Sequence, residues 1–308
     1  MSYMTNNRER KRRMKTSLDN LILYVENVTD YQFNSFRQQL EIAETYGRIP
    51  RVKYFVGVRI TQYHHNLTIG EGGGAVYIGY KHNTAKEGSY DGYTLRMEVN
   101  PSKHGGKGVE KAKEYFNELF VQSFVSNTKK IKGIDVAYDI PIAKNDLYVV
   151  SKTGREKQIL KGTVFYGERS QHGHLKIYDK KKELKERQGI SIPEEHLTRV
   201  EFSVRIENPM TIQFFGSIGH MGINDMYQVS ELKIDNSEGL VKACLIAVST
   251  GEMQMNELTR TYQNKTKKAL ASMGLLDLDH EYTNAQKEII NIIKQYLAPS
   301  KDTILVTI

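Results

Sequence analysis

Alternating apolar and polar residues predict β-strands through the first two thirds of the chain. In four of these segments apolar side chains recur at every second position, which is the period of a strand that buries one face. Gly-rich and Pro-containing stretches separate the segments and predict turns. The predicted strands are Ser17–Glu26, Arg51–Thr61, Leu67–Ile69, Ala75–Tyr80, Tyr93–Asn100, Lys132–Ile140, Gly162–Gly167, His174–Asp179 and His196–Ile206.

Helical periodicity appears at two places among these strands and dominates after Pro209. Thr29-Asp30 predicts the N-terminal cap of a helix with Phe33, Phe36, Leu40 and Ala43 on one side. A second helix is predicted over Lys107–Phe124. The last third of the chain predicts three further helices, over Ser237–Thr250, Met253–Met273 and Thr283–Leu297.

The order of elements predicts an α+β fold followed by a mostly helical C-terminal portion. A weak internal repeat supports a duplicated βαβ-like unit that forms one antiparallel-rich sheet with helices on one face. Val76–Gly79 is similar to Val164–Gly167, and Arg96–Val99 to Arg199–Phe202. We therefore divide the chain into a basic arm (residues 1–15), an α+β domain (16–206) and a helical region (207–308) that is a candidate for dimerisation or DNA specificity.

Strand alternation places chemically active side chains together on one face of the predicted sheet. Opposite the apolar residues lie acids, bases and a tyrosine from four strands, which are Arg96, Glu98, Asp135, Asp139, His174, Lys176, Tyr178, Arg199 and Glu201. A sheet with one solvated face shows such a pattern routinely. Acids that recur on three strands beside a tyrosine on the fourth nevertheless indicate a functional site.

The carboxylates are hard oxygen ligands, the kind that Mg²⁺ or Mn²⁺ prefers. A metal ion can polarise a phosphoryl oxygen while a tyrosine oxygen attacks the phosphorus. Asp135 and Asp139 would lie roughly 13 Å apart on an ideal strand, so we favour Asp135 and Glu201 as metal ligands, with Glu98 and Asp139 behind them. Tyr178 is the candidate nucleophile.

Positive charge surrounds this tyrosine and also the N-terminus. The chain has 44 Lys+Arg against 36 Asp+Glu, a net charge of +8. Residues 1–15 hold six basic residues against one acid, and residues 144–187 hold twelve against six. Lys180 and Lys181 are candidate catalytic residues because their charge favours a tyrosinate. The candidate DNA contacts are Arg10, Arg12, Arg13, Lys176, Lys182 and Arg199.

Composition excludes several classes of protein. One cysteine, Cys244, excludes a disulfide framework and a cysteine-based zinc cluster. No window approaches the ~18 uncharged apolar residues of a membrane span, and no apolar segment of a secretory signal follows the basic N-terminus. We therefore expect a cytoplasmic protein with no membrane partner.

Several segments together resemble the Rep_trans family of rolling-circle plasmid replication initiators of Gram-positive bacteria, which is related to the nicking domains of some conjugative relaxases. The segments run in order from SLDNLILYVENV through RMEVNPSK, GIDVAYDI, KGTVFYGERS and LKIYDKKKELKER to EHLTRVEFSV, over residues 16–206. The family's active-site tyrosine lies in an I-Y-[DN]-K-K segment, and Tyr178 occupies that position. The basic arm and the region after Pro209 have no counterpart in the family pattern.

The resemblance implies an enzyme that nicks one strand of a double-strand origin, locally single-stranded or cruciform. It implies a 5′-phosphotyrosyl intermediate, a free 3′-OH and later strand rejoining, with Mg²⁺ or Mn²⁺ as cofactor. A homodimer and the host replication helicase are the implied partners. Two alternatives remain, a conjugative relaxase with a similar mechanism and a non-catalytic DNA-binding copy-control protein.

Each candidate residue also has a purely structural interpretation. Tyr178 is one of 19 tyrosines and could simply pack at the sheet surface. Glu98 and Glu201 could pair with an arginine of a neighbouring strand, and Asp139 could cap the turn that Pro141 begins. His172-Gly173-His174 is similar to the His-hydrophobe-His metal motif of other nicking enzymes, but glycine stands in the hydrophobic place. His174 stays a candidate ligand because it shares a face with Tyr178.

Overall fold

A computed structural model of the chain describes residues 14–47, 52–56, 65–69, 76–83, 92–101, 124, 127–231, 239–250, 253–271 and 274–297. The candidate DNA contacts Arg10, Arg12 and Arg13 and most of the helix predicted over Lys107–Phe124 lie outside these residues. No helix among the described residues is long and apolar enough to cross a membrane.

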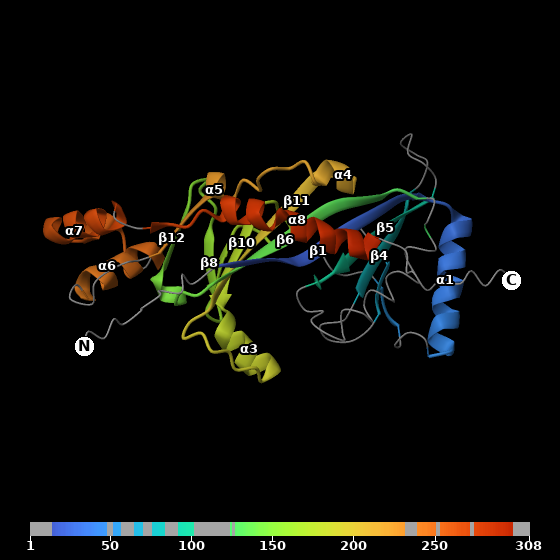
Figure 1. The fold of residues 1–308 in the computed structure, drawn as a ribbon, viewed down its shortest axis with the longest axis horizontal. Helices are drawn as coiled ribbons and strands as arrows, with labels where there is room; N and C mark the ends of the chain where they lie inside the picture. The colour runs from blue at the N-terminus through green and yellow to red at the C-terminus, as the bar shows by residue number, and fades with distance from the viewer. Residues whose placement is uncertain are drawn as a thin grey trace, which may run out of the picture.

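A ten-stranded antiparallel sheet forms the centre of the molecule (Figure 1). Its strands are β1 (Lys15–Val28), β2 (Lys53–Val56), β3 (His65–Ile69), β4 (Val76–Asn83), β5 (Gly92–Val99), β6 (Lys129–Ile140), β8 (Lys157–Leu160), β9 (Thr163–Tyr166), β10 (His174–Asp179) and β11 (Thr198–Met210). Their spatial order is β2-β3-β4-β5-β1-β6-β11-β10-β9-β8. The α+β class and the antiparallel sheet are confirmed.

The sheet consists of two halves with the same strand order. In the first half β1 pairs with β5, followed outward by β4, β3 and β2. In the second half β6 pairs with β11, followed outward by β10, β9 and β8. The two halves meet where β1 pairs antiparallel with β6, and Asn20 lies opposite Asp135 at this seam. The predicted duplication is therefore visible in the topology.

Strand position corrects one detail of the predicted repeat. Arg96-x-Glu98 and Arg199-x-Glu201 stand on β5 and β11, which are equivalent strands. Val76–Gly79 stands on β4, whose equivalent is β10, whereas Val164–Gly167 belongs to β9 and the residue after it. The similarity between those two short segments therefore does not follow the duplication.

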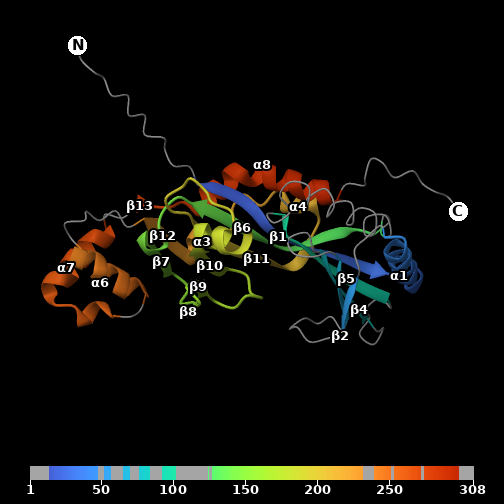
Figure 2. The same ribbon diagram turned by 90° about the horizontal axis from the view of Figure 1, so that it is seen from below.

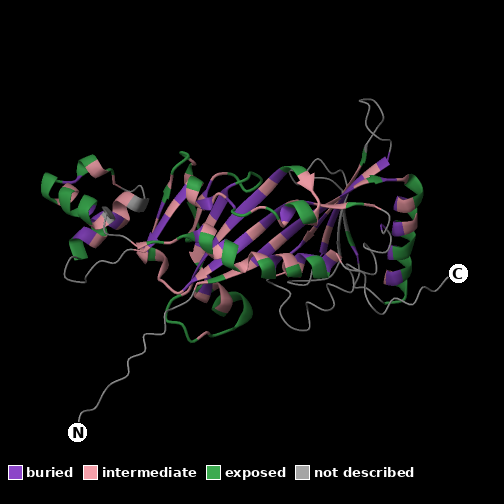
Figure 3. Cartoon of the chain, turned by 45° about the horizontal axis from the view of Figure 1, so that its top comes forward, coloured by how far each residue is buried: buried purple, intermediate pink, exposed green. Residues whose placement is uncertain are grey.

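The apolar face of the sheet carries the main core. Val136, Tyr138, Val200 and Phe202 have no exposed surface, and the polar residues between them are mostly half-buried, so the predicted alternation is confirmed (Figure 3). Burial of this face is the main favourable contribution to folding.

Helices cover this apolar face from both ends of the sequence. α1 (Asp30–Thr45) begins at the Thr29 cap, and its Phe33 ring stacks on Tyr93 of β5 at 3.9 Å. α8 (Leu278–Leu297) lies across β1 and β6 (Figure 1) and buries Tyr282, Ile289 and Ile293 in the same core. The short helices α4 (Ile212–Phe215) and α5 (Ile223–Met226) lie near it.

The C-terminal part also adds a second, smaller sheet and a helical pair. β7 (Leu147–Ser151), β12 (Tyr227–Glu231) and β13 (Gly274–Leu275) form a three-stranded sheet. α6 (Gly239–Thr250) and α7 (Arg260–Ala271) pack on each other at the end of the molecule away from α1 (Figure 1). The strands of this small sheet and the hairpin strand β8 were not predicted.

One helix lies on the polar side of the sheet. α3 (Lys180–Gln188) follows β10 directly, and Asp179 caps it by accepting a hydrogen bond from the Lys182 amide. Gly189 ends the helix in the left-handed conformation, with φ of 67°, which glycine adopts without strain. This connection fixes α3 beside the C-terminal end of β10, where Tyr178 stands.

Candidate functional site

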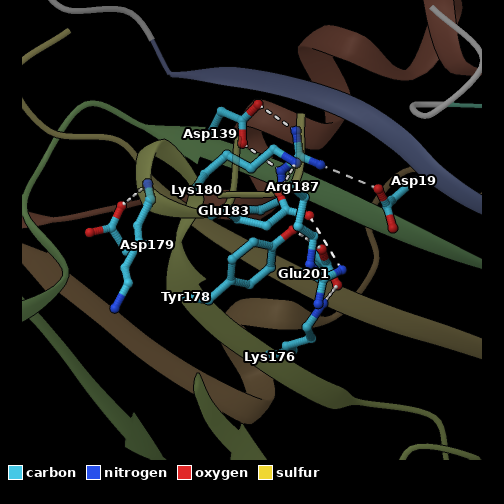
Figure 4. Close-up of polar contacts among 11 residues, drawn as sticks. Asp19, Asp139, Lys176, Tyr178, Asp179, Lys180, Glu183, Arg187 and Glu201 are labelled. Atoms are coloured by element: carbon cyan, nitrogen blue, oxygen red, sulfur yellow. Dashed lines mark hydrogen bonds and ion pairs between the residues drawn. The ribbon is translucent and has the colours of Figure 1, made fainter. Parts of the chain in front are cut away.

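Tyr178 stands in the middle of a hydrogen-bonded group on the polar face (Figure 4). Its hydroxyl donates a hydrogen bond to Glu201 Oε1 at 2.7 Å. Lys176 Nζ donates to the second oxygen, Glu201 Oε2, at 2.8 Å and lies 4.3 Å from the Tyr178 ring centroid. β10 and β11 pair so that Lys176 is directly opposite Glu201 and Tyr178 is one diagonal away. The structure therefore brings three of the predicted site residues together.

The environment keeps the Tyr178 hydroxyl protonated. Burial raises the pKa of Tyr178 far above its ordinary value, and the negative charge and hydrogen bond of Glu201 raise this pKa further. The Arg199 charge acts in the opposite direction and is outweighed. A nucleophilic Tyr178 would therefore need a base to remove its proton, and the Glu201 carboxylate is already at hydrogen-bond distance.

Arg199 holds two acids in place beneath this group. Its guanidinium donates to both oxygens of Asp139, at 2.6 and 2.7 Å, and to Asp19 Oδ1 at 3.3 Å. Arg199 is only 7% exposed. Arg199 was predicted as a DNA contact and Asp139 as a residue behind the metal ligands; in the structure these two side chains are bound to each other.

The predicted lysines divide into two kinds. Lys180 is buried, and its Nζ donates to Glu183 at 2.5 Å, while Lys181 Nζ donates to the backbone carbonyls of Glu194 and Glu195. Lys182, by contrast, has a side chain that is 68% exposed. Lys182 is thus the most accessible of these three lysines.

A hollow of about 450 Å³, which we call the seam hollow, opens where the two halves of the sheet meet. It is lined by Asp19, Asn20, Tyr77, Glu98, Val99, Asn100, Asp135, Phe165, Arg169, His174, Lys176, Glu201 and Ser203. Four of these are acids, and each has a basic partner. The acids are Asp19, Glu98, Asp135 and Glu201, and their partners, in the same order, are Arg199, Arg96, Arg205 and Lys176.

A second hollow of about 570 Å³ lies on the other side of Tyr178, which we call the lysine hollow. The basic residues that line it are Lys144, Lys161, Lys176, Lys181, Lys182 and Arg187, against four acids. Tyr178 and Lys176 both line this hollow, and Lys176 lines the seam hollow too. Lys176 is therefore shared by the two hollows, and Tyr178 lines the lysine hollow.

His174 belongs to the seam hollow in a defined tautomer. Its Nδ1 lies 3.0 Å from the carbonyl oxygen of Gly167, and because a carbonyl can only accept, Nδ1 carries the proton. Burial lowers the pKa of His174, although the Gly167 hydrogen bond and the Asp135 charge raise it in part. The neutral ring then keeps Nε2 unprotonated, as a metal ligand requires.

The donor chemistry of the seam hollow suits a hard divalent cation, with carboxylates from both halves and an imidazole. Among the described residues, however, no three such side chains lie close enough to form a ready-made metal site. Asp135 accepts from Arg205 at 2.7 Å, and Glu201 accepts from Lys176 and Tyr178. A bound ion would have to replace some of these hydrogen bonds.

Two members of the group were missed from the sequence. Asp19, Leu21 and Leu23 are alternate residues of β1, so a regular strand would point Asp19 to the apolar face. A β-bulge between Leu18 and Asn20 turns it to the polar face instead. Arg205 continues the alternation of Arg199 and Glu201 on β11, so its place on this face could have been predicted from strand period.

Curated proteins of Staphylococcus aureus align with about two thirds of this chain. One named replication initiation protein is 25% identical over 214 residues, which are 66% of this chain and 62% of that protein. A second of the same name is 23% identical over 212 residues, with the same coverage. The chain is a homologue of these replication initiation proteins. The resemblance stated from the sequence is confirmed at this level.

The similarity covers only part of each relative, because the chain spans about 62% of the length of the first two. No protein-family model matches the chain. Among solved structures, the rolling circle replication initiator protein from Geobacillus stearothermophilus matches 83% of this chain and 97% of its own, with 13% identity and a TM-score of 0.38.

Proposed function

We propose that this chain is a plasmid rolling-circle replication initiator that nicks one strand of a double-strand origin through Tyr178. The observation that carries the proposal is the 2.7 Å hydrogen bond from the hydroxyl of Tyr178, which lines the lysine hollow, to Glu201, which lines the seam hollow. Homology to replication initiation proteins supports the same function.

In the proposed reaction Glu201 acts as the general base. As Glu201 takes the proton, the Tyr178 oxygen attacks the scissile phosphorus and forms a new P–O bond. The bond from phosphorus to the 3′ oxygen breaks, and that oxygen takes up a proton to become a free 3′-OH. The 5′ phosphate stays on Tyr178, and attack by a 3′-OH on this link rejoins the strand.

Lys176 supplies positive charge at the point where negative charge develops. Its ammonium is held against Glu201 and over the Tyr178 ring. When Glu201 becomes neutral by taking the proton, Lys176 loses its counter-charge and can attract a phosphate oxygen instead. The lysine hollow, with Lys182 exposed at its rim, would hold neighbouring phosphates.

A divalent ion, Mg²⁺ or Mn²⁺, is part of the proposal. Asp135 and Glu201, on the neighbouring strands β6 and β11, would hold it, with His174 Nε2 as a further ligand, since all three line the seam hollow. Glu98, three strands from Glu201 on β5, would lie behind them. When bound, such an ion would act as a Lewis acid on a phosphoryl oxygen. We also propose that the protein acts in the cytoplasm as a homodimer that hands the opened origin to a host helicase.

The test uses a supercoiled plasmid that carries this protein's gene and flanking DNA, mixed with protein and Mg²⁺ or Mn²⁺. After denaturation, the expected products are nicked circles and a protein–DNA adduct at Tyr178. Tyr178→Phe should abolish both and leave DNA affinity nearly unchanged, because only a hydroxyl is lost. Tyr24→Phe on β1 is the matched control, and it should nick at the normal rate.

The outcomes separate the alternatives. If Tyr178→Phe nicks normally, another residue is the nucleophile. DNA binding without a nick or an adduct in either metal favours a non-catalytic copy-control protein. A nicking protein that does not support plasmid replication favours a conjugative relaxase. Full activity in EDTA contradicts the metal requirement.

A further inference from the structure

The first half of the sheet contributes residues to the site, but its strand β4 has no tyrosine at the position equivalent to Tyr178. In the second half Tyr178 lies opposite Arg199, two residues from the pair Lys176–Glu201. In the first half Gly79 lies opposite Arg96, and Tyr77 lies opposite Glu98. The position equivalent to Tyr178 is therefore a glycine.

The first half nevertheless lines the seam hollow together with the second half. Tyr77 of β4 and Phe165 of β9 line it at opposite ends, six strand-to-strand steps apart. At about 4.8 Å a step this is about 29 Å on a flat sheet, so the hollow is a long trough across the strands. Figure 2 shows that β2 and β8, the outer strands, both lie on the side of the sheet away from α8.

The charge of this trough determines which part of a DNA strand it suits. Its lining holds four acids, each paired with a basic side chain, so the charge of its floor is largely balanced and does not draw in a row of phosphates. Aromatic rings and the amides of Asn20 and Asn100 suit bases, which are neutral and carry hydrogen-bonding edges. Duplex DNA presents phosphates outward, so the floor favours an unpaired strand.

We propose that the seam hollow binds a single-stranded segment of a few nucleotides, with its bases toward the protein and with Tyr77 and Phe165 as stacking platforms at its two ends. Single-strand-binding proteins use aromatic platforms of this kind, with sites of about 4–16 nucleotides. Phe165 lies 5.9 Å from His174 between their ring centres. This inference rests on the proposed function, and it gives the first half of the duplicated sheet a role in positioning DNA.

The test measures binding without cleavage. The probe is oligothymidylate that carries one 2-aminopurine, and the protein is the full chain with Tyr178→Phe, in EDTA. Adding Tyr77→Leu should weaken binding of the single strand about 5- to 150-fold and reduce the fluorescence quenching. Tyr77→Phe keeps the ring and should restore both. A duplex of the same length should bind equally well to all three proteins.

Controls separate stacking from misfolding. Tyr31 on α1 is 83% exposed and does not line the trough, so Tyr31→Leu should bind like its parent. Unchanged circular dichroism and Tm in Tyr77→Leu would show that the fold persists. Phe165→Leu is the second, independent variant and should weaken binding in the same range.

Three outcomes would overturn the inference. Equal single-strand affinity of Tyr77→Leu and its parent refutes the platform, even if the wild type forms the Tyr178 adduct. Equal loss of duplex binding would show a general effect on the protein. If both Tyr77→Leu and Phe165→Leu still quench the 2-aminopurine fluorescence as the parent does, the bases do not stack on Tyr77 or Phe165. If the wild type forms no adduct but Tyr77→Leu still weakens binding, the nicking proposal fails and the trough stands.

Discussion

Replacing Glu201 by glutamine separates a catalytic base from a structural partner. The amide oxygen of Gln has the position of Oε1 and can still accept the Tyr178 hydrogen bond. A hydrogen bond to a charged group contributes about 1.5–3 kcal/mol and a neutral one about 0.5–1.5 kcal/mol, so this bond weakens by about 1 kcal/mol. The Lys176 side chain is 34% exposed, so its lost ion pair adds only about 0–1 kcal/mol.

The expected loss of stability is therefore about 1–2 kcal/mol, out of about 5–15 kcal/mol for a folded domain. The expected loss of nicking rate is much larger, about 10²- to 10⁴-fold, because general-base catalysis contributes that much. The assay is single-turnover nicking of the supercoiled origin plasmid at saturating protein, with urea unfolding measured in parallel. The rate of Glu201→Gln should also rise with pH, since hydroxide can replace the missing base.

Glu183→Gln is the matched control for this variant. Glu183 is comparably buried and bound to Lys180, but it makes no hydrogen bond to Tyr178. Its replacement should cost similar stability and leave the nicking rate within tenfold of wild type. A Glu201→Gln protein that nicks within threefold of wild type would refute Glu201 as the base. A raised Mg²⁺ requirement would show that Glu201 also binds the metal.

Two further predictions concern charge and pH. Arg199→Met should lower the free energy of unfolding by about 3–5 kcal/mol, because it removes the positive charge that Arg199 places against the buried acids Asp139 and Asp19. Arg187→Met, at a 74% exposed site, should change it by less than about 1 kcal/mol, and equal effects in urea unfolding would contradict the assignment. Burial lowers the pKa of His174 in the folded protein below its unfolded value of about 6.5. The neutral His174 side chain therefore contributes fully to the free energy of unfolding above a pH of about 6.5, and this contribution is lost as the pH falls from there through the lowered pKa. An NMR titration that gives His174 a pKa above 6.5 would contradict this.

Strand period accounts for what could be predicted from the sequence. From this period we could predict which residues form the apolar face and which form the polar face, and that Tyr178 and Glu201 lie on the same face, because side chains alternate wherever a strand is regular. The period predicts the wrong face for Asp19, because a β-bulge interrupts the alternation of β1 at that residue. It also failed for β8, whose Ile159 and Leu160 are exposed and show no buried face.

Pairing between strands could not be predicted, and pairing decides which residues meet. Asp139 and Arg199 are 60 residues apart, yet they are cross-strand neighbours on β6 and β11. The sequence pattern presented both as available for ligands, whereas in the structure each satisfies the other. Period alone predicts a face, but only register shows which charges on that face are already paired.

The duplication brings equivalent residues of the two halves to one hollow at the seam. The seam joins β1 to β6, and Asn20 of the first half lies directly opposite Asp135 of the second. Glu98 and Glu201, the equivalent acids, line the same hollow from the two sides. Gly79 stands at the first-half position equivalent to Tyr178, so in the proposed reaction the attack on phosphorus comes from the second half, while the first half can still contact the strand.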